Sequence, residues 1–154
     1  MPPTALERLV TNKIAAHLPS PDQIGRTPLG NHLFFEWRCA CPDIGALWLT
    51  VSARDEIILS CEIAHEHFSR SRYLREKLTN LQRKRRIARD AVQEARRFLR
   101  DEIAATITYA PDGSIHSYGW CPTAQLASSH QYERKAFGEG ITRRAWTWQG
   151  EVTE

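Results

Sequence analysis

The stretch that decides the fold runs from Arg70 to Ile103 and has the sequence RSRYLREKLTNLQRKRRIARDAVQEARRFLRDEI. It contains no Gly or Pro, and residues that favour helices dominate it. Its apolar residues recur at steps of three, four or seven, namely Leu74, Leu78, Leu81, Ala88, Val92, Ala95, Leu99 and Ile103. This spacing aligns them on one side of a helix. The pattern predicts one long amphipathic helix, unless a bend near its polar middle divides it, and its apolar stripe must pack on the rest of the chain.

The same stretch is strongly basic. Between Arg70 and Arg100 there are twelve Arg or Lys residues and only three acidic residues, a net charge of +9. Because the whole chain carries a formal charge of +3, the remainder of the chain carries −6. The sequence therefore predicts a basic helix on an acidic body.

Strand-like segments precede this helix. Residues 1–18 predict a short helix, since Thr4 and Glu7 have the spacing of a capping box. Three runs with strand composition or alternating apolar residues follow, at His32–Ala40, Ile44–Ala53 and Glu56–Ala64. Because their connections are short, we expect an antiparallel meander.

Further strands are predicted after the helix. Asp112-Gly113 separates the alternating runs Ala104–Ala110 and Ser114–Trp120, which is a strong hairpin signal. Residues 123–132 form either a short helix or irregular structure, and Ile141–Trp148 has the composition of a last strand. The predicted fold class is α+β, with an antiparallel sheet of five or six strands, the long helix on one face and the short N-terminal helix.

Length and composition favour one globular domain over residues 1–154, because 42% of the residues are hydrophobic and 25% are charged. No apolar run is long enough to span a membrane, and no secretory signal is visible at the N-terminus. Four cysteines without an export signal indicate reduced thiols. We therefore expect a cytoplasmic protein without a membrane partner.

One polar cluster raises a metal or catalytic hypothesis. His65 and His67 alternate at the end of a predicted strand, so that both imidazoles face the same side. With Cys39 and Cys41, which share this spacing, they supply the ligand types of a tetrahedral zinc site. The spacing differs from the usual Cys-x2-4-Cys, and no known catalytic motif is present. We expect no enzyme activity and no cofactor, and keep a small metal-dependent enzyme using His65 and His67 as an alternative.

The basic helix raises a second alternative, which is nucleic-acid binding. Its basic residues have helical spacing and include Arg83, Lys84, Arg85, Arg86, Arg89, Arg96, Arg97 and Arg100. Such a stripe can follow phosphates, with strongly salt-dependent affinity. The competing interpretation is a solvated helix face whose arginines pair with carboxylates of the same chain. No recognised nucleic-acid-binding module accompanies the stripe.

Four short motifs support a different interpretation. The run Glu56-Ile57-Ile58-Leu59-Ser60 is followed by His65-Glu66-His67-Phe68 and the helix, then by Trp120-Cys121-Pro122 and Arg144-Ala145-Trp146. Over about residues 31 to 150, the chain resembles small cytosolic bacterial proteins that act as immunity partners of polymorphic toxins. The resemblance implies binding and neutralisation of a toxin. Immunity proteins against nucleases are often acidic, so the basic helix implies a toxin with an acidic face or cleft.

The sequence therefore predicts a non-enzymatic interaction protein, an immunity protein that occludes a cognate bacterial toxin. The helix arginines would steer docking, and histidine side chains would anchor the contact. The expected partner-binding residues are His65, His67, Arg83, Arg85, Arg86 and Arg89. A helix of this length can also pack against its own copy, which keeps a homodimer as a further hypothesis.

Overall fold

A computed structural model describes residues 2–153 of the chain. They divide into two compact units, which are described separately. The first contains residues 2–38, 46–60 and 66–96, and the second contains residues 39–45, 61–65 and 97–153. The α+β class is confirmed, with two antiparallel sheets of five and four strands in place of one sheet. The single domain stays a prediction.

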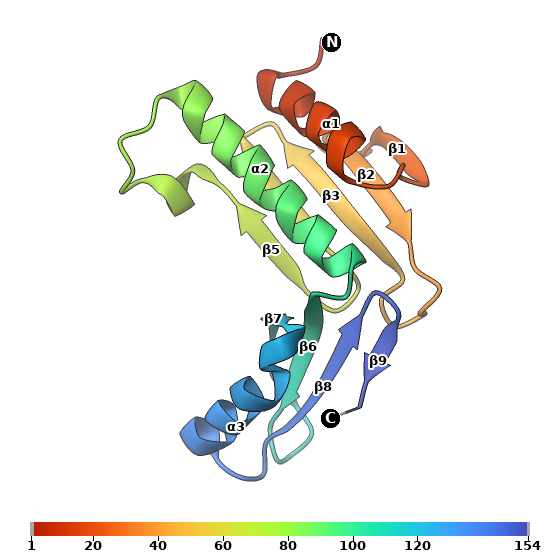
Figure 1. Ribbon diagram of the computed structural model, residues 1–154, viewed down its shortest axis with the longest axis vertical. Helices are drawn as coiled ribbons and strands as arrows, with labels where there is room; N and C mark the ends of the chain where they lie inside the picture. Colours follow the sequence, from red (N-terminus) through yellow and green to blue (C-terminus); the bar gives the residue numbers. More distant parts are fainter. Residues whose placement is uncertain (1, 154) are drawn as a thin grey trace. The chain divides into compact units, whose positions relative to one another are not determined.

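A five-stranded antiparallel sheet forms the body of the first unit (Figure 1). Its strands lie in chain order and are β1 (Gln23–Arg26), β2 (Leu33–Arg38), β3 (Ala46–Ser52), β4 (Glu56–Ser60) and β5 (His65–Phe68). The expected alternation holds in β3 and β4, because Leu47, Leu49 and Leu59 are all fully buried. The predicted meander is therefore confirmed, with β1 and β5 added at its edges.

Two helices cover one face of this sheet, α1 (Ala5–His17) and α2 (Asn80–Leu99) (Figure 1). The buried side of α2 consists of Ile87, Ala88, Ala91, Val92, Ala95 and Phe98, each no more than 2% exposed. Small Ala side chains on this side allow close approach of the helix to its neighbours. The prediction that the helix buries an apolar stripe is confirmed.

The predicted start of this helix at Arg70 is wrong. Residues Arg70–Tyr73 form a short 3-10 helix, η1, and α2 begins only at Asn80. Thr79 precedes it and forms a reciprocal cap, since Gln82 N donates to Thr79 Oγ1 at 3.2 Å and Thr79 N donates to Gln82 Oε1 at 2.8 Å. Such a cap satisfies backbone groups that are free at the first turn of a helix.

Three apolar residues assigned to the stripe, Leu74, Leu78 and Ile103, therefore lie outside α2, and Leu81 lies in its first turn but is exposed. Leu74 and Leu81 are 70% and 49% exposed. Ile103 is the first residue of β6 (Ile103–Tyr109). The third predicted strand is also too long, because the chain turns after Ser60, where Cys61 N donates to Ala64 O at 2.9 Å.

The second unit contains a four-stranded sheet in the order β7-β6-β8-β9. Its other elements are β7 (Ile115–Pro122), the 3-10 helix η2 (Thr123–Gln125), α3 (Leu126–Phe137), β8 (Thr142–Thr147) and β9 (Gly150–Val152). The hairpin around Asp112-Gly113 is confirmed, and Gly113 has the positive φ of +83° that such turns favour. The segment after Pro122, which the sequence left open, is helical.

Phe98, which belongs to the second unit, makes aromatic contacts with two tryptophans of that unit. The ring of Phe98 meets Trp120 edge-on with a centroid separation of 4.9 Å, and it meets Trp148 at 5.9 Å. Edge-to-face pairs of this kind add to the stabilisation from burial. Among residues 2–153, no helix combines the length and apolar character needed to cross a membrane.

The capping box at the start of α1 is confirmed and includes a buried carboxylate. Glu7 accepts a hydrogen bond from Thr4 N at 2.6 Å and another from Arg26 Nη1 at 2.7 Å. Burial raises the pKa of Glu7, but these donors and the charge of Arg26 outweigh it, so that the pKa lies below its ordinary value. The charged form of Glu7 therefore stabilises the fold.

Replacement of Glu7 by Gln is expected to lower the free energy of unfolding by about 1–2 kcal/mol at neutral pH, because a charge-assisted network is lost. The pKa of Glu7 is lower in the folded state than in the unfolded state. This contribution is therefore complete above about pH 5 and is lost as the pH falls through the folded-state pKa. Urea unfolding in acid should therefore show a smaller difference. Exposed Glu102, which has no side-chain partner among residues 2–153, provides the control variant Glu102→Gln. An equal loss at both pH values would contradict this assignment.

A cationic groove between two helices

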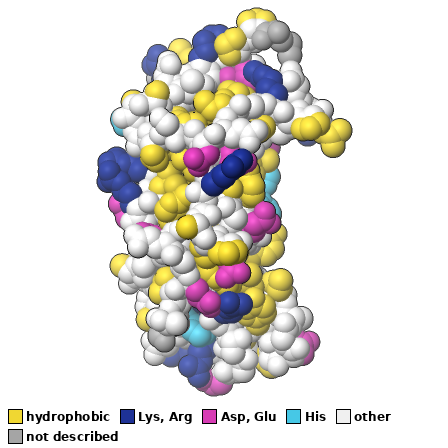
Figure 2. Space-filling model, turned by 90° about the vertical axis from the view of Figure 1, so that its right-hand side faces the viewer, with side chains coloured by type: hydrophobic (Ala, Val, Ile, Leu, Met, Phe, Trp, Pro, Cys, Tyr) yellow, Lys and Arg dark blue, Asp and Glu magenta, His cyan; other side chains and the backbone are white. Residues whose placement is uncertain are grey.

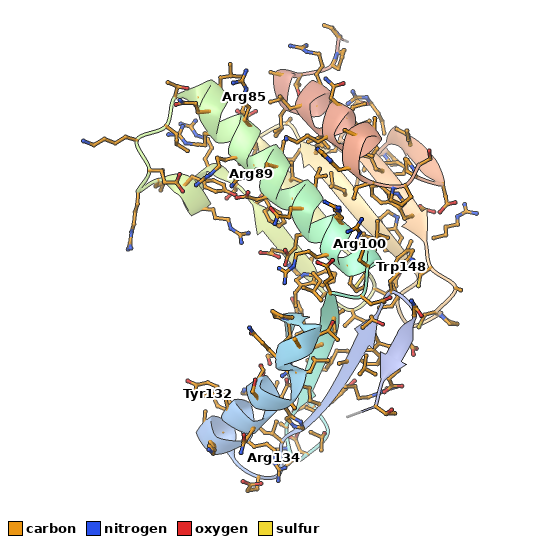
Figure 3. The ribbon with its side chains drawn as sticks, viewed as in Figure 1. Arg85, Arg89, Arg100, Tyr132, Arg134 and Trp148 are labelled. Carbon is orange, nitrogen blue, oxygen red and sulfur yellow. The ribbon has the colours of Figure 1, made fainter. Side chains whose placement is uncertain are left out.

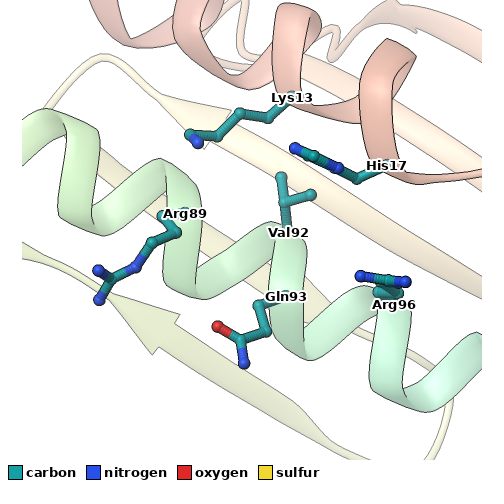
Figure 4. Close-up of a pocket in the computed structure, with 6 residues that line it drawn as sticks. All are labelled: Lys13, His17, Arg89, Val92, Gln93 and Arg96. Carbon is teal, nitrogen blue, oxygen red and sulfur yellow. The ribbon is translucent and has the colours of Figure 1, made fainter.

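A groove lies between α1 and α2 in the first unit. Its more enclosed part is a cavity of about 190 Å³, lined by Lys13, His17, Arg89, Val92, Gln93 and Arg96. Lys13 and His17 come from α1, and the other four residues come from α2 (Figure 4). Three of the six are permanently basic residues, and no carboxylate lines the cavity.

A second hollow of about 280 Å³ continues the groove and is lined by Leu9, Lys13, Arg85, Arg86 and Arg89. Lys13 and Arg89 line both hollows, so the two are adjacent. Arg85 and Arg89 lie on successive turns of α2 (Figure 3). The groove is therefore a continuous cationic surface with apolar side chains in its lining.

The cations of the groove differ in how far the chain neutralises them. Arg86 pairs with Glu76 at 2.9 Å, and Arg89 pairs with Asp90 at 2.7 Å. Lys13, Arg85 and Arg96 have no ion-pair partner among residues 2–153. Because like charges that share a surface repel one another, the groove favours an anionic ligand.

The position of Arg89 is set by its contact with half-buried Asp90. Asp90 accepts hydrogen bonds from Arg89 Nε at 2.8 Å and from the hydroxyl of buried Tyr73 at 2.7 Å. Burial and the negative charge of Asp90 raise the pKa of Tyr73 well above its ordinary value. The guanidinium of Arg89 accordingly points away from α1 in Figure 4, whereas Lys13, His17 and Arg96 lie around the space between the helices.

Three of the predicted partner-binding residues, Arg85, Arg86 and Arg89, line the groove. Arg83 does not, since its Nη2 donates to Leu78 O at 3.1 Å and so supports the turn before α2. His67 does not line the groove either, and its Nδ1 lies 2.8 Å from Glu56 Oε1.

His65 lies in the second unit, where the centroid of its ring is 5.5 Å from that of Tyr118. His65 is not among the residues that line the groove. The proposal that His65 and His67 anchor a partner has no support from the groove, and it stays a prediction for these two residues.

The sequence did not single out Lys13, His17 and Arg96 as members of the site. Lys13 and His17 are four residues apart, so they share one side of α1. Arg96 belongs to the basic stripe and lies seven residues after Arg89. Helical spacing can show which residues share one side of each helix. Only the packing of α1 beside α2 brings the two sets of side chains together in one groove.

The cysteines do not assemble the zinc site that the sequence left open. Cys39 and Cys41 are half-buried, Cys61 and Cys121 are buried, and all four are free thiols. Burial raises the pKa of both Cys39 and Cys61, which favours the neutral thiol over the thiolate that binds metal. Within residues 2–153, no group of three or more His, Cys, Asp or Glu side chains is arranged to hold a metal ion.

The face shown in Figure 2 carries separate Lys and Arg side chains, several of them next to acidic ones, with hydrophobic side chains between them. Mixed surfaces of this kind are ordinary on soluble domains. The groove between α1 and α2 differs because its charged lining residues all have the same sign.

Comparison with known proteins identified no relative of this chain. No family model matches the chain, and neither a curated protein nor a solved structure matches it. The function is therefore inferred from the residues and geometry of the groove.

Replacement of Tyr73 by Phe is expected to lower the free energy of unfolding by about 1 kcal/mol at neutral pH, because Asp90 loses a donor. The pKa of Tyr73 is higher in the folded state than in the unfolded state. The contribution of its hydroxyl to the free energy of unfolding is therefore complete below about pH 10 and is lost as the pH rises above that value. Urea unfolding should therefore show a smaller difference between the two proteins in alkali. A difference that grows with pH would contradict the Tyr73–Asp90 contact.

Proposed function

We propose that this chain is a non-enzymatic interaction protein whose cationic groove binds an acidic surface of a partner protein. The observation that carries the proposal is that every charged residue lining the groove between α1 and α2 is basic. Three of them, Lys13, Arg85 and Arg96, have no ion-pair partner among residues 2–153. A partner carboxylate would supply the counter-charge that the chain itself does not.

The chemistry of the groove favours binding over catalysis. Its described lining residues supply positive charge, hydrogen-bond donors and apolar contact, but no hydroxyl, thiol or carboxylate group. Hydroxyl, thiol and carboxylate nucleophiles are thus absent from the described lining, and the amine of Lys13 and the imidazole of His17 are the only side chains there that could act as nucleophiles. Arginine forks instead give paired hydrogen bonds to carboxylates, which suits recognition of an acidic partner.

The proposed partner is a cognate bacterial toxin, and the proposed location is the cytoplasm. The support for this step is the similarity of short motifs to immunity proteins, together with the charge of the groove. A basic immunity protein would occlude a toxin through an acidic face or cleft. Electrostatic attraction between the two surfaces would also accelerate their association.

Nucleic-acid binding is a second candidate, and one observation favours it. Arg85, Arg89 and Arg96 follow one side of α2 over twelve residues, or about 16 Å of helix. Such a row can contact several phosphates of one strand. Titration with random duplex and single-stranded oligonucleotides at low salt tests this candidate, and binding that weakens steeply with added salt would favour it over a protein partner.

The immunity proposal is tested by co-expression with the protein encoded beside this gene. We expect that protein to arrest growth alone, and to be neutralised and bound by this chain. The variant Arg85→Glu/Arg96→Glu should weaken binding at least tenfold in calorimetric titration, because two attractive contacts become repulsive. A neighbouring product that is harmless or does not bind this chain would overturn the proposal.

The matched control is Arg54→Glu/Arg75→Glu. It makes the same charge change at two exposed residues of the first unit that have no ion-pair partner among residues 2–153 and do not line the groove. Binding should stay within about threefold of wild type, the change that a general loss of positive charge produces. Equal weakening by both variants would move the interface away from the groove.

A further inference from the structure

We infer that the enclosed end of the groove, around Lys13, His17 and Arg96, is a binding site for a dianionic phosphate group, such as that of a phosphate monoester. This site would accept a small ligand, and it does not depend on the proposed toxin partner. The residues come from two helices packed side by side in the same unit, and they line one cavity. In Figure 4, His17 and Arg96 lie toward one end of it, and the Lys13 ammonium extends toward Arg89.

The charge of this space favours a dianion. Lys13 and Arg96 are permanently basic and have no ion-pair partner among residues 2–153, and His17 adds an imidazole to the lining. Arg89 contributes less, because Asp90 neutralises it at 2.7 Å. Two positive charges without an ion-pair partner match a phosphate dianion better than a single carboxylate.

The helix dipoles oppose this charge only in part. His17 is the last residue of α1, and Arg96 lies in the last turn of α2, so both helices present their negative ends near the cavity. Each end is equivalent to about half a negative charge. Together they offset about one of the positive charges, which leaves the cavity cationic.

The donors and the size of the cavity also suit a phosphate. Arg96 offers a planar fork and Lys13 a flexible ammonium. A volume of about 190 Å³ is below the range of about 300–1,000 Å³ that is usual for drug-sized ligands. The cavity therefore fits one charged group, and Val92 would contact the organic group of a phosphate monoester.

The test uses the full chain without any partner, so its outcome is independent of toxin binding. Inorganic phosphate and O-phosphoserine are titrated calorimetrically at constant ionic strength, with chloride as the balancing anion. We expect saturable binding of both, and chemical-shift changes in the nuclear magnetic resonance spectrum at Gln93 and Val92. Lys13→Met and Arg96→Gln should each weaken binding about tenfold, since each removes a charge-assisted contact.

Two controls locate the site and identify the ligand. Arg54→Gln removes an equal charge outside the groove and should leave the affinity within about twofold of wild type. Dimethyl phosphate carries one negative charge and should bind about tenfold more weakly than O-phosphoserine, because it has half the charge. Equal affinity for the two would overturn the preference for a dianion and favour a phosphodiester backbone. Absence of saturable binding, or binding unaffected by Lys13→Met and Arg96→Gln, would overturn the site itself.

Discussion

Burial of one side of α2 is the constraint on which the first unit depends. Ile87, Ala88 and Ala91 are completely buried in a helix that lies across the five-stranded sheet. Because a helix has 3.6 residues per turn, this burial decides which residues face outward. The basic residues between the buried ones must lie along the sides of α2, and α1 beside it supplies the second wall of the groove.

The sequence predicted the class of structure better than its boundaries. Alternation in β3 and the Asp-Gly turn depend on neighbouring residues, so both were predictable. The helix start was misplaced because Leu74 and Leu78 continue the apolar spacing by coincidence, although Thr79 and Gln82 carry a capping-box signature. The division of the strands into two sheets depends on pairing between distant segments, which periodicity does not report.

The candidate site was predictable in the same partial way. A cluster of arginines with helical spacing identified Arg85, Arg86 and Arg89, because spacing along one helix can be derived from the sequence. Lys13 and His17 were missed because they approach α2 only through tertiary packing. The sequence also could not separate cations with a carboxylate of their own, such as Arg86 beside Glu76, from those without one.

We propose that the groove cations without ion-pair partners contribute to binding and not to the fold. The free energy of unfolding of Lys13→Met/Arg85→Gln/Arg96→Gln in urea at low ionic strength tests this proposal. We expect a value equal to or higher than that of wild type, because mutual repulsion is relieved and no ion pair is broken. A decrease of more than about 1 kcal/mol, the upper range for surface ion pairs, would show that these side chains stabilise the fold and would contradict the proposal.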